Sequence, residues 1–240
     1  SWDLVKNYTN LLSLHVTEVH DDHLVTKDYI CQNSFIPASK AVKHPFNGPL
    51  HKEPSFSVFT QILNHSIPCL GFAIKERFHV NIMKDRVSDL GLEIGPWLKE
   101  LKEALFNNKD ADSEFVVGPD KKHRRKKSFV LGDLAKQIAL ITPGQKVSYI
   151  ADVVYSKSNV EKIIEIVKDS DHLFIEAAFL EKDRDIAEKK CHLTAWQAGS
   201  IAGKARVKQM TPFHFSPRYQ GQAHILEKEA MDAYYDTLNR

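Results

Sequence analysis

Four polar residues stand where a strand of this 240-residue chain is expected to end, namely His65, Asp152, Glu176 and His214. In layered α/β folds, functional groups gather at strand ends, because the loops there vary over a rigid sheet. Two histidines and an aspartate supply nitrogen and oxygen donors, which suit a hard or borderline divalent metal. An aspartate can also bridge two ions, since a carboxylate has two oxygens.

Each of these residues also has an ordinary structural explanation. The chain contains 12 histidines, and a given histidine is more often a surface or hydrogen-bonded residue than a ligand. Asp152 could cap a turn, and Glu176 could form a solvated ion pair. The sequence has no HExxH, CxxC pair, P-loop or GxGxxG. Spacing alone therefore leaves the chemistry open.

The elements that must position these residues change character along the chain. Alternating patterns predict a hairpin from strands 14–19 and 24–30, then strands at 56–63 and 70–74. The last part alternates strand and helix: strand 146–154, a helix around 160–167 with Ser158 and Glu161 at capping-box spacing, strand 173–175, helix 194–205, strand 207–213 and helix 223–238. Strands followed by β-α-β-α favour an α/β sandwich.

The middle of the chain combines a helix with a polar stretch. Residues 97–106 have helical periodicity after Gly95-Pro96. Residues 107–128 are polar and are interpreted as a loop insertion that ends in a basic run: Lys121, Lys122, Arg124, Arg125, Lys126 and Lys127. The run could contact nucleic-acid phosphates or act as a sorting signal. A solvated loop is the favoured alternative, because no aromatics interleave the charges.

Composition bounds the class of protein. Hydrophobic residues make up 42% and the net charge is +2, which indicates a globular protein and leaves nucleic-acid binding open. No apolar run reaches the roughly 20 residues that span a bilayer, so no membrane partner is expected. Three cysteines without CxxC spacing favour a reducing, cytoplasmic compartment. The chain begins at Ser1 without a signal peptide pattern.

Six short segments of the chain resemble sequence motifs of a known enzyme family. Residues 213–219, FHFSPRY, resemble the "THFSxRY" segment of ribonuclease Z-type enzymes in the metallo-β-lactamase superfamily. Residues 192–199, HLTAWQAG, are similar to their "HSTxxEAG" segment, and 149–153, YIADV, to "YSGDT". Each match is moderately specific.

The other three segments keep the family's order. Residues 173–179, LFIEAAF, resemble "LLIHEATF", and 64–72, NHSIPCLGF, resemble "DHxxPSLGY". The stretch 91–101 resembles "LGIPPGPLxxKL". The ordered set spans positions 64 to 219 and is far more specific than any one segment. It implies a metallo-β-lactamase-type αββα sandwich.

The resemblance also implies roles for individual residues. His65, Asp152 and His214 are similar to metal ligands, with Asp152 in the bridging position. Glu176 and His192 resemble the catalytic Glu–His pair near the scissile phosphate. The implied cofactor is a divalent metal, expected as two Zn ions with Mn or Fe as alternatives. Two such ions clamp an in-line displacement at phosphorus and activate a water, while a histidine protonates the leaving oxygen.

Several departures from the family pattern shape the prediction. The HxHxDH motif is absent, and His20-Asp21-Asp22-His23 lies in an expected hairpin turn without HxH spacing. Val153 replaces the threonine that follows the motif aspartate. We therefore expect residues 1–240 to form a single metallo-β-lactamase-like domain that lacks its N-terminal part; a degenerate relative is the alternative. The family's protruding arm, which grips the tRNA elbow, would lie between Phe72 and Gly91, where only a short stretch is present.

The leading hypothesis is a metal-dependent hydrolase that cleaves RNA phosphodiester bonds, with activity of this chain by itself left open. One alternative is a related hydrolase of a small ester or cyclic phosphodiester, which the short arm region favours. Another is a non-catalytic relative that binds nucleic acid or protein. RNA or a small phosphodiester is the expected substrate, and a homodimer is left open.

Overall fold

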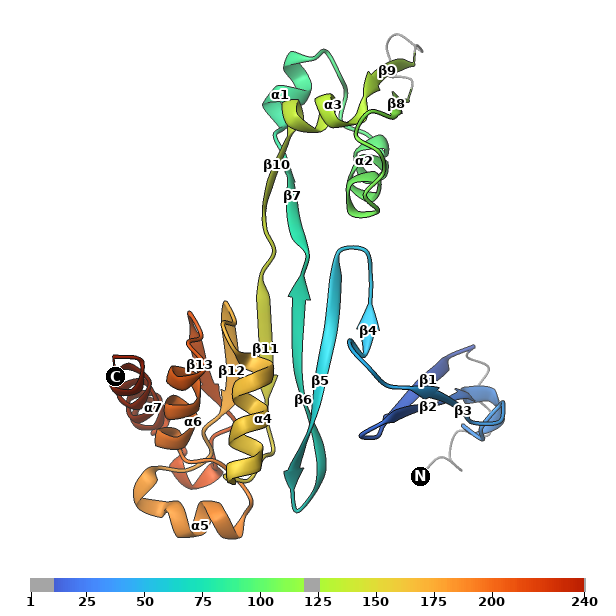
Figure 1. Cartoon of the computed structure of the whole chain (residues 1–240). Coiled ribbons are helices and arrows are strands. Elements are labelled where there is room, and N and C mark those ends of the chain that lie inside the picture. The colour runs from blue at the N-terminus through green and yellow to red at the C-terminus, as the bar shows by residue number, and fades with distance from the viewer. Residues whose placement is uncertain (1–10, 119–125, 240) are drawn as a thin grey trace.

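The structure is a computed structural model that describes residues 11–118 and 126–239. Its largest sheet has six strands in the order β13-β12-β11-β6-β5-β4. Their bounds are β4 His51–Lys52, β5 Phe56–His65, β6 Ile67–Glu76, β11 Lys146–Ile150, β12 His172–Glu176 and β13 Met210–Phe213. The last three strands are parallel, whereas β5 and β6 form an antiparallel hairpin that joins them through β6. Figure 1 shows this sheet in the lower part of the molecule.

Helices pack on one face of the six-stranded sheet. They are α4 (Lys157–Val167), α6 (Ala195–Lys204) and α7 (Ala223–Leu238), whereas α5 (Arg184–Lys189) lies beyond the strand ends at the bottom of Figure 1. The α6 helix packs closely on α7, because a Cβ added at Gly199 would lie 2.0 Å from the Ala230 carbonyl oxygen. These helices bury the alternate residues of β11 and β12, such as Ile150 and Ile175, and form the main hydrophobic core. The predicted α/β class is confirmed.

The opposite face of the sheet is apolar and partly exposed. Ile74, Val147 and Tyr149 point to this side, and each is more than a third exposed. The described residues thus present one β-layer with helices on one side. A second β-layer of the αββα sandwich is not found against it among residues 11–118 and 126–239.

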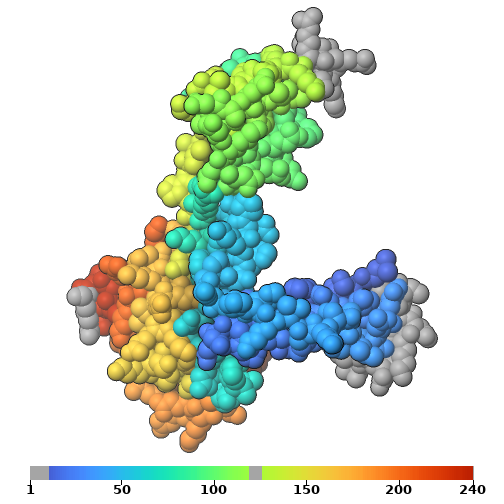
Figure 2. All heavy atoms as spheres, turned by 45° about the vertical axis from the view of Figure 1, so that its right-hand side comes forward, coloured from blue at the N-terminus to red at the C-terminus, as the bar shows by residue number. Residues whose placement is uncertain are grey.

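An arm projects from the sheet on a two-stranded stalk, β7 (Phe78–Ile82) paired with β10 (Ala139–Pro143) (Figures 1 and 2). Its head contains α1 (Lys84–Asp89), α2 (Trp97–Phe106), β8 (Glu114–Val117), β9 (Lys127–Val130) and α3 (Leu131–Ile138). A separate core, including Leu101 and Leu134, holds the head together. The expectation of only a short stretch in place of the arm is wrong, because the arm extends well beyond Gly91 and closes at Pro143.

A three-stranded sheet lies at the N-terminal end of the described residues. It comprises β1 (Ser13–Val19), β2 (His23–Ile30) and β3 (Val42–Pro45). The hairpin expected over 14–30 is present, and His20 and His23 stack face to face across its turn. No helix in the described ranges is both long and apolar enough to cross a membrane.

Two helix starts differ in how closely they follow the sequence expectation. The α6 helix has a full capping box, in which Thr194 and Gln197 exchange hydrogen bonds with each other's backbone. The α4 helix is capped by Ser156, which accepts a hydrogen bond from the Asn159 backbone, and not by Ser158. Ser156 is the cap because its backbone is extended and it directly precedes the first turn of the helix.

Candidate metal centre

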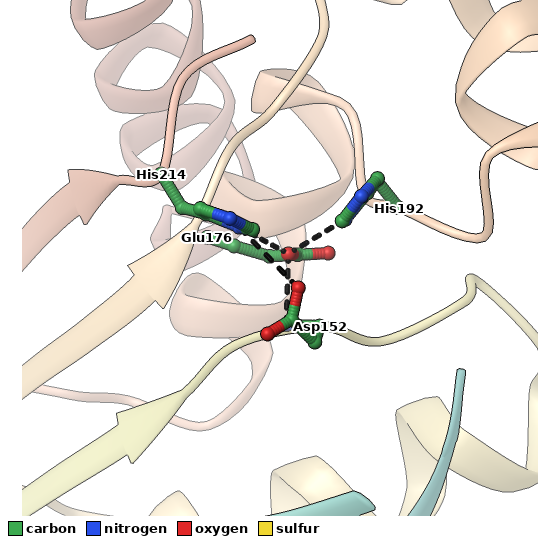
Figure 3. A group of neighbouring side chains, drawn as sticks. All are labelled: Asp152, Glu176, His192 and His214. Atoms are coloured by element: carbon green, nitrogen blue, oxygen red, sulfur yellow. Dashed lines mark hydrogen bonds and ion pairs between the residues drawn. The ribbon is translucent and has the colours of Figure 1, made fainter. Parts of the chain in front are cut away.

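Three neighbouring parallel strands bring their chemistry to one edge of the sheet. Asp152 follows β11, Glu176 ends β12 and His214 follows β13. Because these strands are adjacent and parallel, their carboxyl ends meet. His192 reaches the same place from the loop between α5 and α6 (Figure 3), and His65 stands at the end of β5.

Four of these side chains form a compact cluster. One ligand atom from each of Asp152, Glu176, His192 and His214 lies within 4.8 Å of the others. The His214 Nδ1 atom is 3.8 Å from Asp152 Oδ1. His65 Nε2 lies 4.0 Å from that same oxygen, so His65 stands at the edge of the cluster. The structure therefore brings together all five residues that the sequence singled out for metal binding and catalysis.

Glu176 is the fully buried centre of the cluster. Its carboxylate accepts hydrogen bonds from the backbone N–H groups of Asp152, Val153 and Leu193 at 2.9, 3.3 and 2.9 Å, and from Nδ1 of His192 and His214 at 3.0 and 3.1 Å. Burial by itself raises the pKa of Glu176, but the bonds from His192, His214 and the Leu193 N–H outweigh it and lower the pKa to about 2. The carboxylate is thus ionised at neutral pH.

An ionised carboxylate only accepts hydrogen bonds, so it dictates the tautomer of its two histidines. The Nδ1 atoms of His192 and His214 must carry the protons that Glu176 accepts. The His65 Nδ1 likewise donates to the Cys191 carbonyl oxygen at 2.8 Å. All three rings therefore keep Nε2 free for a ligand or a proton. This is the carboxylate- or carbonyl-oriented histidine arrangement common around protein-bound metals.

Strained backbone marks three residues of the site. Asp152, Cys191 and His214 have φ values of 54°, 60° and 60°, which non-glycine residues adopt uncommonly. Such conformations persist only where the surroundings over-determine them, and they cluster at functional sites. The Asp152 loop is fixed by the Cys69 thiol, which donates to the Asp152 carbonyl oxygen at 3.0 Å. Burial raises the pKa of that thiol to about 11, so it acts as a donor and not as a nucleophile.

The position of His65 depends on a buried side chain from α4. Asn159 donates to the carbonyl oxygens of Asn64 and Val154 and accepts from the Asn64 N–H. These bonds join the end of β5 to the loop that carries Asp152. Asn159 was not singled out from the sequence, because nothing in its spacing separates it from other polar residues of the helix.

The donor set fits a borderline divalent cation. Asp152 offers a carboxylate oxygen, while His214 and His65 offer imidazole nitrogens, a combination that suits Zn²⁺, Mn²⁺ or Fe²⁺. The side chains of Asp152 and His214 are 53% and 42% exposed, so the cluster is open to a substrate. Val153 is fully buried, and its side chain packs in the main hydrophobic core.

The other candidate regions lie elsewhere. Of the basic run, Lys121, Lys122, Arg124 and Arg125 fall outside the described residues, and only Lys126 and Lys127 are placed. The Lys127 ammonium donates to the carbonyl oxygens of Leu90 and Gly91 within the arm. The His20–His23 segment forms the β1–β2 turn in the N-terminal sheet, as expected of a hairpin.

Comparison with known proteins supports the motif resemblance. The chain is 33% identical over 182 residues to the Ribonuclease Z of Crocosphaera subtropica, covering 73% of this chain and 50% of that protein. It is 26% identical over 205 residues to the Ribonuclease Z of Deinococcus radiodurans, covering 85% and 58%. The chain thus spans about half the length of the curated relatives it matches. No family model matches it.

Solved structures with similarity to the chain include the metallo-beta-lactamase fold protein YhfI from Bacillus subtilis. That match has 16% identity and a TM-score of 0.43, and it covers 78% of this chain and 47% of the other. Human tRNase Z, short form, matches with 17% identity and a TM-score of 0.39 over 72% and 41% of the two chains.

The ordered motifs and the curated relatives point to the same class: the chain is ribonuclease Z-like in sequence, and its segments resemble those of the metallo-β-lactamase superfamily.

Proposed function

We propose that the protein containing this chain is a metal-dependent phosphodiesterase that cleaves RNA in the manner of ribonuclease Z. The observation that carries the proposal is the convergence of Asp152, Glu176, His192 and His214 within 4.8 Å. All four lie in segments that resemble the family's motifs. Curated relatives named Ribonuclease Z support RNA as the substrate class. The projecting arm also supports tRNA as the substrate, because the resemblance implies an arm that grips the tRNA elbow.

In this proposal Asp152, His214 and His65 hold the metal through one carboxylate oxygen and two Nε2 atoms. These three donors would serve one ion, and a second ion would need further donors; zinc is the proposed metal, with manganese or iron as alternatives. When bound, such ions act as Lewis acids on the phosphoryl oxygens and lower the pKa of a bound water.

The remaining residues orient and move protons. Glu176 accepts from Nδ1 of both His192 and His214, which keeps each ring from rotating. His192 then has Nε2 directed away from Glu176, where a protonated ring can donate to the leaving oxygen. The negative charge of Glu176 stabilises that protonated ring. Glu176 thus orients both histidines, of which His214 would bind the metal and His192 would donate a proton.

The test uses the complete natural protein, purified and analysed for bound metal. We expect it to contain or take up zinc, manganese or iron, and to cleave a precursor tRNA. Hydrolysis of a generic phosphodiester without cleavage of RNA would instead point to a small-diester hydrolase. Failure to bind any of the three metals would contradict the catalytic proposal and leave a non-catalytic binding protein.

We also propose a cytoplasmic location. The three cysteines Cys31, Cys69 and Cys191 are all free thiols, which fits a reducing compartment. A homodimer, left open by the sequence, stays a prediction.

A further inference from the structure

A small cavity lies beside two histidines of the candidate site, His192 and His214. It has a volume of about 230 Å³ and borders His192 and His214, while neither Asp152 nor Glu176 lines it. Drug-sized ligands occupy roughly 300–1,000 Å³, so this space suits one flat ring and not a folded RNA stem. Its position places a bound ring next to the group that would touch the scissile phosphate.

The walls of the cavity are largely apolar and rigid. Ala178 and Phe179 are buried parts of the main core, and Phe215 packs against that core while it lines the cavity. Phe179 in turn lies against the His192 ring, with 6.3 Å between the ring centroids. Aromatic side chains on a fixed scaffold form stacking platforms for nucleobases.

A lysine at the rim adds a positive charge beside the apolar walls. Lys190 lines the cavity, is exposed, and follows the last residue of α5. Its backbone N–H is fixed by the carbonyl oxygens of Ile186 and Ala187, but its ammonium has no ion pair or hydrogen bond within the described parts of the chain. An unpaired cation two residues before His192 is placed to neutralise an anion beside the reacting group.

We propose that this cavity is a nucleotide subsite: a base that flanks the scissile phosphate stacks in the apolar pocket, and Lys190 binds the next phosphate along the strand. The inference rests on the proposed phosphodiesterase function and deepens it. It specifies a single-stranded oligonucleotide as the substrate at the cleavage point, because a small cyclic diester has no second phosphate for Lys190.

The first test measures binding alone, so its outcome is independent of catalysis. The probe is a fluorescein-labelled tetrauridylate titrated against the complete metal-free protein and followed by anisotropy. We expect Lys190→Ala to weaken binding about tenfold. The plot of log affinity against log salt concentration should also become shallower by about 0.7, the value for one lost phosphate contact on a single strand.

Lys189→Ala is the matched control. Lys189 is the neighbouring lysine at the end of α5, is also exposed, and does not line the cavity. We expect it to leave the affinity and the salt slope as they are. Equal effects of the two substitutions would overturn the subsite, because they would show a diffuse charge effect.

A second variant tests the stacking wall. Phe215→Leu keeps apolar volume but removes the aromatic face, and we expect it to weaken tetrauridylate binding about fivefold or more. The same substitution should matter less for an abasic analogue of the probe. An identical loss for both probes would contradict base stacking.

Hydrolysis separates this inference from the proposed function. With metal-loaded complete protein, Lys190→Ala should raise the KM for the oligonucleotide about tenfold more than the KM for bis(p-nitrophenyl) phosphate. Wild-type hydrolysis with equal effects on both substrates would refute the subsite and leave the phosphodiesterase intact. Oligonucleotide binding that depends on Lys190 without hydrolysis would refute the phosphodiesterase and leave the subsite.

Discussion

The body, which is the six-stranded sheet with its packed helices, and the arm are stabilised in different ways. The body packs helices on one face of β11 and β12, and Ile150, Leu173 and Ile175 are completely buried. The arm stands on two strands and closes its own small core around Leu101 and Leu134. The difference shows that a site needing sub-ångström order is built on the rigid sheet, whereas the arm needs only to reach outward.

The two regions also differ in how their polar groups are used. In the body, Glu176 is completely buried and satisfied by five hydrogen-bond donors. In the arm, polar contacts tie one piece of chain to another at the surface, as when Arg77 donates to the Phe106 carbonyl oxygen and to Asn108. Buried networks specify geometry, while surface contacts adjust orientation.

The largest effect is expected at the proposed metal centre of the body. Asp152→Asn removes the negative oxygen that His65 and His214 face, and should lower phosphodiester hydrolysis by more than about 100-fold, since even supporting residues of metal sites are worth 10–100-fold. Metal content and initial rates measure the loss in the complete protein.

Asp169→Asn is the control for this substitution. Asp169 is also exposed, with φ of 55° against 54° for Asp152, but it pairs with Arg206 away from the cluster. Full metal loading of Asp152→Asn, or an equal loss from Asp169→Asn, would show that the cluster is not the centre.

A core substitution in the arm should separate the stability of the two regions. Leu134 is fully buried in α3, so Leu134→Ala should cost about 2–5 kcal/mol of arm stability. Hydrogen exchange should rise across α2 and α3 and stay slow in β11 and β12. The exposed Lys136→Ala in the same helix serves as the control. Equal loosening of both regions would mean that they unfold as one unit.

A smaller effect is expected where the end of α2 in the head contacts Arg77 at the base of the stalk. Arg77→Ala removes two hydrogen bonds of 2.6 Å to Phe106 and Asn108, at an exposed site where about 1 kcal/mol or less is at stake. Spin labels in the head and body should report a broader distance distribution without a change in metal binding. Arg86→Ala in α1 is the control, and unchanged distances in Arg77→Ala would argue against a positioning role.

The smallest effect is a pH-dependent ion pair of the body. The hydrogen bond from the Lys208 ammonium, aided by the Lys146 N–H, lowers the pKa of Asp171 below its usual value of 3.8. The resulting stability is present above pH 4 and is lost as pH falls through the lower folded pKa, so Asp171→Asn should destabilise at pH 6 more than at pH 3. Urea unfolding measures the loss of unfolding free energy caused by the substitution, which should differ between the two pH values by less than about 1 kcal/mol. A larger loss at pH 3 than at pH 6 would contradict the predicted direction of the pKa shift.

Local pattern predicted the body far better than the arm. In the body, the α7 helix at Ala223–Leu238 follows its apolar periodicity, and in the arm only the α2 helix at Trp97–Phe106 does so. The strands β7 and β10 gave no such signal, because a five-residue strand on a solvated stalk has little core to impose alternation. The arm closes only when residues about 60 positions apart in the chain pair.

By itself, the sequence determined the class, the strand-end residues and the order of the motifs, since these depend on local chain chemistry. Only the tertiary structure decided that Glu176 would anchor both His192 and His214, and that the Cys191 carbonyl would orient His65. It also decided that Lys190 would stand beside a cavity next to His192. These relations join residues from separate strands and loops, and their geometry exists only once the sheet has assembled.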